Sequence, residues 1–191
     1  IWLNGTAAPF DNKALREAVA AAVDIDAIVQ GIYLGIGVPA NGPISPASWA
    51  YATDIPARTV DLDLARAKLE EAGMPDGFPF AFKTEAAPRN LQVGQLMQGG
   101  LSEVGNTMEV IQVDTATQIA DTVAKNFEAT WSQWSGRPDP DGNTFQHFHA
   151  DGGMNYGGFD NPEVNELLDQ GREVSDQEER AQIYARVTEI L

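Results

Sequence analysis

The fold class is decided by residues 61–84, which read DLDLARAKLEEAGMPDGFPFAFKT. The first half predicts a helix that begins at Asp61 or Asp63 and ends at Gly73, because glycine commonly follows the last turn of a helix. The second half alternates apolar and polar residues over positions 78–84, as a strand with one buried face does. We therefore expect the three phenylalanines of this strand to share a face. A helix followed directly by a strand indicates an α/β fold.

The alternation continues on both sides of this stretch. It predicts a mainly parallel or mixed sheet flanked by helices. The other expected strands are residues 1–3, 108–113 and 127–134. In the first half of the chain, one further helix is expected from a cap at Asp11 or Asn12 to about Gln30, and another over residues 90–104. A capping box at Thr115 and Gln118 predicts a helix that ends at about Lys125, and a helical turn is expected at 143–149. The last two expected helices run from Asn161 to about Arg172 and onward from a capping box at Ser175 and Glu178. Residues 31–51 and 137–158 are expected to be irregular.

Length and composition predict an ordinary globular protein. The 191 residues suit a single domain covering positions 1–191, and 43% of them are hydrophobic. A balance of 12 basic against 28 acidic residues leaves a net charge of −16, which repels phosphate backbones and excludes nucleic acid as a partner. The absence of cysteine excludes disulfides and thiolate sites. No apolar run approaches the roughly 20 residues of a membrane span.

Five segments, taken together and in order, resemble the extracellular solute-binding proteins of family 5. These proteins are the peptide-, glutathione-, opine- and nickel-binding components of ABC importers. The segments cover nearly the whole chain. They are residues 4–26 (NGTAAPFDNKALREAVAAAVDID), 37–46 (GVPANGPISP), 63–73 (DLARAKLEEAG), 134–141 (WSGRPDPD) and 155–163 (NYGGFDNPE).

The resemblance implies one lobe of a periplasmic-binding-protein-like fold of class II, cut from a longer two-lobed protein whose other lobe is absent. The apolar first residues and the helical pattern at the last ones also lead us to expect a piece of a longer chain. The implied function is capture of a peptide, opine or similar small solute and its delivery to an ABC permease, without catalysis and without a cofactor or metal. The implied location is the periplasm, or the outer face of the cytoplasmic membrane through a lipid anchor.

The candidate ligand-binding residues lie in the two long loops, because ligands of open α/β sheets collect at the carboxyl ends of strands. We expect Trp131 to pack in the core, and Trp134 to end the strand where the loop begins. Aromatic and amide side chains in such loops suit the capture of small ligands. The candidates are Trp49, Trp134, Arg137, Asp139, Asn155 and Tyr156.

Arg137 departs from the pattern of the family. In peptide-binding relatives, an Asp three residues after the Trp of the W-x-G turn pairs with the α-amino group of the peptide, and here that position holds arginine. A guanidinium repels an ammonium group and attracts a carboxylate or phosphate. We therefore expect a ligand with an anionic or sugar-like group near Arg137. The alternative is a surface cation held by Asp139 or Asp141.

Two other functions stay open at this point. A hydrolase could use Asp139, Asp141 and a histidine, although the Asp-Pro-Asp-Gly setting is typical of a turn in which Asp accepts backbone N–H bonds. The chain has no G-x-S-x-G, H-E-x-x-H or P-loop motif. A non-catalytic interaction domain is the third reading. We expect His147 and His149 to lie on the surface or in a groove, without a third metal ligand.

Overall fold

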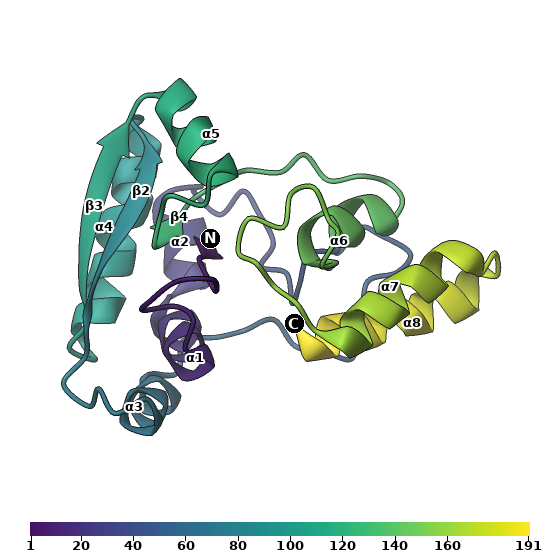
Figure 1. Cartoon of the computed structure of the whole chain (residues 1–191), viewed down its shortest axis with the longest axis horizontal. Helices are drawn as coiled ribbons and strands as arrows, with labels where there is room; N and C mark the ends of the chain where they lie inside the picture. Colours follow the sequence, from purple (N-terminus) through teal and green to yellow (C-terminus); the bar gives the residue numbers. More distant parts are fainter. The chain divides into compact units, whose positions relative to one another are not determined.

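The computed structural model describes residues 1–191 and divides into two compact units. The sheet unit comprises Ile1–Gly37 and Thr59–Gln133, and the helical unit comprises Val38–Arg58 and Trp134–Leu191. Each unit has a hydrophobic core of its own. Figure 1 labels the elements along the chain. That the two units fold together as a single domain, as the length suggests, stays a prediction.

The sheet unit holds a four-stranded mixed sheet, as the alternating pattern predicts. Its strands are β1 (Trp2–Leu3), β2 (Pro79–Glu85), β3 (Thr107–Val113) and β4 (Ala129–Thr130), in the order β1-β4-β2-β3. The central strand β2 runs parallel to both β3 and β4, while β1 is antiparallel to β4. The register places Phe82 opposite Val110 on one side and Ala129 on the other.

The expected strand over residues 127–134 is wrong in its length, because β4 has only two residues. Its neighbour β1 is equally short and offers partners only to Ala129 and Thr130. Beyond them, the Trp131 carbonyl accepts a hydrogen bond from the Gln118 side chain at 2.6 Å and makes no ladder bond. A composition rich in aromatic and β-branched residues favours a strand, but a ladder also needs a paired backbone.

Five helices complete the sheet unit: α1 (Lys13–Ala22), α2 (Ile25–Gly31), α3 (Leu62–Glu71), α4 (Pro88–Ser102) and α5 (Thr115–Val123). The single helix expected up to Gln30 is wrong. Val23 is extended, and the Asp24 side chain accepts a hydrogen bond from the Ala27 amide at 2.8 Å, which starts α2. The capping box expected at Thr115 is also wrong by one residue, since Asp114 caps α5.

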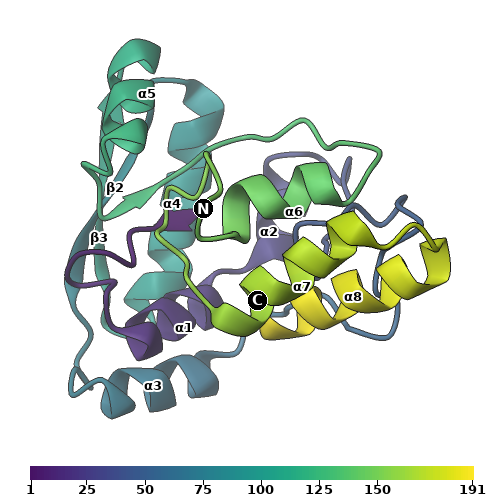
Figure 2. The ribbon, with the colours of Figure 1, turned by 45° about the vertical axis from the view of Figure 1, so that its right-hand side comes forward.

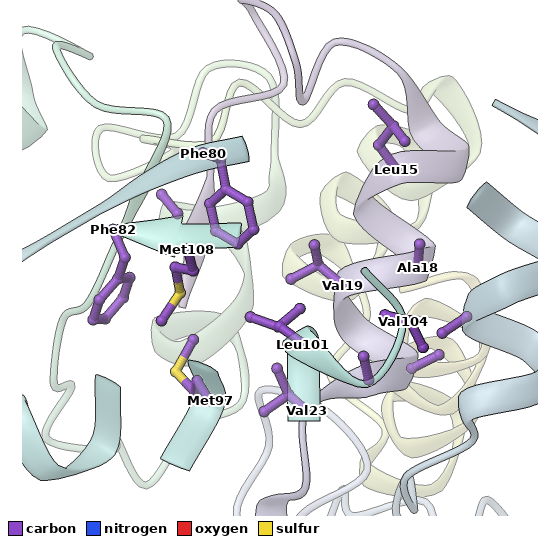
Figure 3. Packing of buried hydrophobic residues seen from close by; sticks show 14 of the residues in the cluster. Leu15, Ala18, Val19, Val23, Phe80, Phe82, Met97, Leu101, Val104 and Met108 are labelled. Carbon is purple, nitrogen blue, oxygen red and sulfur yellow. The ribbon is translucent and has the colours of Figure 1, made fainter. Parts of the chain in front are cut away.

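The core of the sheet unit confirms the expected face of β2. Phe78, Phe80 and Phe82 are all buried, and the rings of Phe80 and Phe10 meet edge to face with centroids 5.1 Å apart. Figure 3 shows side chains of α1, β2, α4 and β3 that converge in this core. Trp131 is partly buried and packs against the same cluster, as expected.

The helical unit consists of the irregular segment 38–58, the helix α6 (Asp141–Phe148) and the neighbouring helices α7 (Pro162–Glu173) and α8 (Gln177–Ile190). Figure 2 shows α7 and α8 side by side, in agreement with their contacts. Asn161 caps α7 as expected, whereas Asp176 rather than Ser175 caps α8. The core of the helical unit consists of Ile44, Ala50, Val164, Leu168, Tyr184 and Val187. Across the whole chain, no helix combines the length and apolarity needed to cross a membrane.

Candidate functional site

All six candidate residues lie in the helical unit and outside its helices. Trp49 lies on the irregular segment. Trp134, Arg137 and Asp139 lie on residues 134–140, which we call the Trp134 loop and which leads into α6. Asn155 and Tyr156 lie on residues 149–161, the glycine-rich loop between α6 and α7.

Asn143, in the first turn of α6, holds the Trp134 loop in place. This side chain is 3% exposed. Its Oδ1 accepts hydrogen bonds from the Trp134 indole N–H at 3.1 Å and from the Arg137 amide at 2.7 Å, and its Nδ2 donates to the Arg137 carbonyl at 2.8 Å. Asn143 was not among the residues predicted from the sequence. The available signal was an Asn just after a turn, where such side chains commonly bond to nearby backbone.

Trp134 and Arg137 form a stacked pair on this loop. Trp134 is 39% exposed, and its ring meets the His147 ring nearly at a right angle, with centroids 4.7 Å apart. The Arg137 guanidinium lies over the Trp134 ring, 4.9 Å from its centroid. A guanidinium over an indole face gains cation–π attraction and loses mobility, while its N–H edge stays available. The pair can therefore present an oriented cation to a ligand.

Asp139 of this loop and Asp141, the first residue of α6, are each held by another arginine. Arg180 binds both carboxylate oxygens of Asp139 at 2.9 and 3.0 Å, and Arg172 binds both of Asp141 at 2.7 and 3.1 Å. The expectation that Asp139 or Asp141 holds Arg137 is therefore wrong. The turn interpretation is confirmed, because Asp139 also accepts the Asp141 amide at 2.9 Å. The Arg180 guanidinium holds the pKa of Asp139 below its ordinary value.

Trp49 joins this group through Arg180. The Arg180 guanidinium lies 5.4 Å from the centroid of the Trp49 ring and donates to the Tyr184 hydroxyl at 3.3 Å. Asp139 and Trp49 therefore both contact Arg180, although 90 positions of sequence separate them. Trp49 remains partly exposed, so its ring offers apolar surface beside the cation.

Asn155 serves the glycine-rich loop itself. Its Nδ2 donates to the carbonyls of His149 and Phe159 at 3.1 and 2.6 Å, and its Oδ1 accepts the Phe159 amide at 2.9 Å. The side chain is buried, and its bonds close the loop upon itself. Tyr156, the next residue, is half-buried. Contact of either residue with a ligand stays a prediction.

The expectation of surface or groove histidines is wrong, because His147 and His149 are 6% and 7% exposed. His147 follows Asn143 by four positions and so lies on the same buried face of α6. Burial lowers the pKa of His147, against the opposing effect of a hydrogen bond with the Met154 backbone. The His149 ring stacks on Phe145 with centroids 4.2 Å apart, and its Nδ1 accepts the Asp151 amide. No three potential metal ligands gather anywhere in the chain.

Comparison with known proteins places these features in a family. The sequence profile described as bacterial extracellular solute-binding proteins, family 5 Middle, matches residues 1–156. Heme-binding protein A of Haemophilus influenzae is 29% identical over 100% of this chain and 36% of its own length. The dipeptide-binding protein of Escherichia coli is 25% identical over 96% of this chain and 36% of its own length.

Solved structures agree with the sequence comparison. The periplasmic binding protein DppA of Helicobacter pylori, in complex with the peptide STSA, superposes with a TM-score of 0.92 at 25% identity. The match covers 99% of this chain and 38% of that one. This confirms the expected mixed α/β fold of a periplasmic-binding-protein-like lobe. The chain spans little more than a third of the length of the curated relatives given above.

Proposed function

Since the chain belongs to the extracellular solute-binding proteins of family 5, we propose that it forms one lobe of the solute-binding component of an ABC importer. The complete protein captures a peptide, opine or similar small solute outside the cytoplasmic membrane and delivers it to permease subunits. Relatives named for binding heme and dipeptides, and a structural neighbour in complex with a peptide, support this function. The expected partners are the missing lobe, the solute and the permease. The expected location is periplasmic or lipid-anchored at the membrane.

The stacked pair of Trp134 and Arg137 is the single observation that carries the proposal for this chain. An exposed indole and a cation, held by a buried amide, are suited to bind one end of a small solute. We include Trp49 and Tyr156 as further contacts. Asp139 and Asn155 contribute by holding the surrounding loops, as their bonds indicate.

A hydrolase built on Asp139 and Asp141 is not favoured. General acid–base catalysis needs a carboxyl group that gains and loses a proton near the working pH. Both carboxylates instead make paired bonds to arginines, and the pKa of Asp139 is lowered by Arg180. Relatives of the chain are named as binding proteins. We therefore expect saturable binding without turnover.

The proposed function is tested on the full-length protein that contains this chain. The protein is purified without added solute and denatured, and the released small molecules are identified by mass spectrometry. The protein is then refolded and its affinity for each identified molecule is measured by calorimetry. We expect at least one peptide or other small solute that rebinds at a stoichiometry near one and is recovered unchanged. A released molecule that is consumed on incubation would contradict a binding function.

A further inference from the structure

The cations of the helical unit are few, and almost all of them are occupied. The unit has five arginines and no lysine against thirteen acidic residues. Arg172, Arg180 and Arg186 bind carboxylates, and Arg58 donates to the Leu191 carbonyl. Arg137 differs from these four, since its guanidinium contacts the Trp134 ring and makes neither a salt bridge nor a hydrogen bond. In so acidic a unit, an exposed guanidinium that makes no hydrogen bond to the protein is an exception.

Arg137 has no carboxylate partner because the acidic residues nearest to it in the sequence bind other arginines. Asp139 and Asp141 lie two and four positions after Arg137, close enough in sequence to compete for it. Arg180 and Arg172 reach these carboxylates from α8 and α7 and bind both oxygens of each. Paired bonds of this kind are the strong form of the arginine–carboxylate interaction. The two salt bridges therefore leave Arg137 open to a carboxylate from outside.

The backbone and stem of Arg137 are also fixed. Asn143 binds both the amide and the carbonyl of Arg137. The Arg137 stem lies against Gly142, where an added Cβ would come within 2.8 Å of Cγ. The ring of Trp134 then supports one face of the guanidinium. Holding a side chain in its bound geometry reduces the entropy lost on binding.

We propose that Arg137 binds a carboxylate group of the solute, and that Asn143 and Arg180 act as positioning residues for it. The proposal rests on the proposed function and names the class of its solute. A planar guanidinium supported on one face offers its N–H edge, which matches a planar carboxylate in two parallel bonds. The surrounding acids disfavour a dianion such as phosphate more than a monoanion, because charge repulsion grows with the charge of the ligand.

The test uses the chain of residues 1–191 and acetate as the probe. Two-dimensional NMR follows the Arg137 Nε–H and the Trp134 indole N–H during titration with sodium acetate at constant ionic strength. Glycinamide hydrochloride serves as the cationic probe, and inorganic phosphate as the dianionic one. We expect saturable shifts at both groups with acetate, weaker ones with phosphate and none with glycinamide. Saturation by glycinamide, or by phosphate more tightly than by acetate, would overturn the proposal.

Variants of single arginines distinguish specific binding of acetate at Arg137 from general attraction of acetate to the cations of the protein. Arg137→Gln should weaken acetate binding at the Trp134 indole N–H at least about tenfold, which corresponds to ~1.4 kcal/mol at 25 °C. Arg58→Gln removes an arginine of the same unit and should leave the acetate affinity unchanged. Arg180→Met frees Asp139 to bind Arg137 and should weaken acetate binding, although Arg137 is intact. Equal losses in Arg137→Gln and Arg58→Gln would contradict the assignment. Because acetate is tested on this chain, failure here would leave solute capture by the full-length protein standing.

Discussion

At the scale of single residues, Asn143 anchors the Trp134 loop of the candidate site. One buried amide satisfies the indole N–H of Trp134 and both backbone groups of Arg137. Without it, those groups would lose their partners in a partly buried setting, which costs more than the bonds themselves contribute. The same residue thereby links the stability of the loop to the orientation of the guanidinium.

We expect Asn143→Ala to lower the free energy of unfolding by about 1–3 kcal/mol, the cost of leaving buried polar groups unpaired. Urea unfolding followed by circular dichroism measures this change. Gln182→Ala truncates an exposed amide on α8 and serves as the control, with a change within about 0.5 kcal/mol. If the two variants lose the same free energy, the bonds of Asn143 do not stabilise the loop.

The burial of His147 predicts a dependence of stability on pH. Burial lowers its pKa in the folded protein from the ordinary value of 6.5, so below that pH the unfolded chain binds more protons than the folded one. The stabilisation is therefore complete above the unfolded pKa and is lost as the pH falls through the folded pKa. The Trp134 indole, whose ring meets the His147 ring, carries no ionisable group.

We expect His147→Phe to lose less stability than the wild-type chain between about pH 7 and about pH 5, because phenylalanine does not titrate. Urea midpoints at each pH provide the measurement. The carboxylates whose pKa is lowered, such as Asp139, titrate below this range and affect both proteins equally. If the urea midpoints of the two proteins fall in parallel with pH, His147 does not cause the loss of stability.

At the scale of elements, the packing of α7 against α8 depends on Gly171. An added Cβ there would lie 2.9 Å from the Tyr184 hydroxyl, which is also bonded to Arg180. Gly99 in α4 is a contrasting case, since nothing lies within 4 Å of an added Cβ. Both glycines are within helices, where alanine is favoured over glycine by ~0.5–1 kcal/mol.

Substitution of these two glycines by alanine should therefore change the free energy of unfolding in opposite directions. Gly99→Ala should raise the free energy of unfolding by up to about 1 kcal/mol, from helix propensity alone. Gly171→Ala should lower it by about 1–3 kcal/mol, because the methyl group overpacks the contact with Tyr184. Thermal and urea unfolding of the two variants give the comparison. A stabilised Gly171→Ala variant would mean that α8 can shift away at little cost.

At the scale of the whole molecule, a single domain would unfold cooperatively, so that the sheet unit and the helical unit lose their structure together. Phe82 is fully buried in the core of the sheet unit, and Leu168 in that of the helical unit. Phe82→Ala and Leu168→Ala should each cost about 2–5 kcal/mol. If the chain unfolds as one cooperative domain, hydrogen exchange in urea should show that either variant destabilises both units equally. Loss confined to the mutated unit would identify two independently folding parts.

Much of the fold could be predicted from the sequence, because the relevant forces act over a few residues. The alternation in β2, the cap at Asn161 and the left-handed glycine that follows α3 are all local features, and all were found where expected. The errors at Asp24, Asp114 and Asp176 are also local. In each case, an acidic side chain accepts a hydrogen bond from the amide three residues later and starts a helix. At Asp114 and Asp176 this start lies one residue from the expected cap, whereas at Asp24 it divides the expected helix in two.

The sequence by itself determined the mixed α/β fold, the family and the loops that carry the candidate residues, since periodicity, caps and motif order are properties of neighbouring positions. The tertiary structure alone decided which arginine binds which aspartate, why Arg137 has no carboxylate partner, and that both histidines are buried. Arg172 lies 31 positions from Asp141, and Arg180 lies 41 positions from Asp139. Such pairings depend on how distant segments pack, and any of several nearby charges would satisfy the sequence pattern equally well.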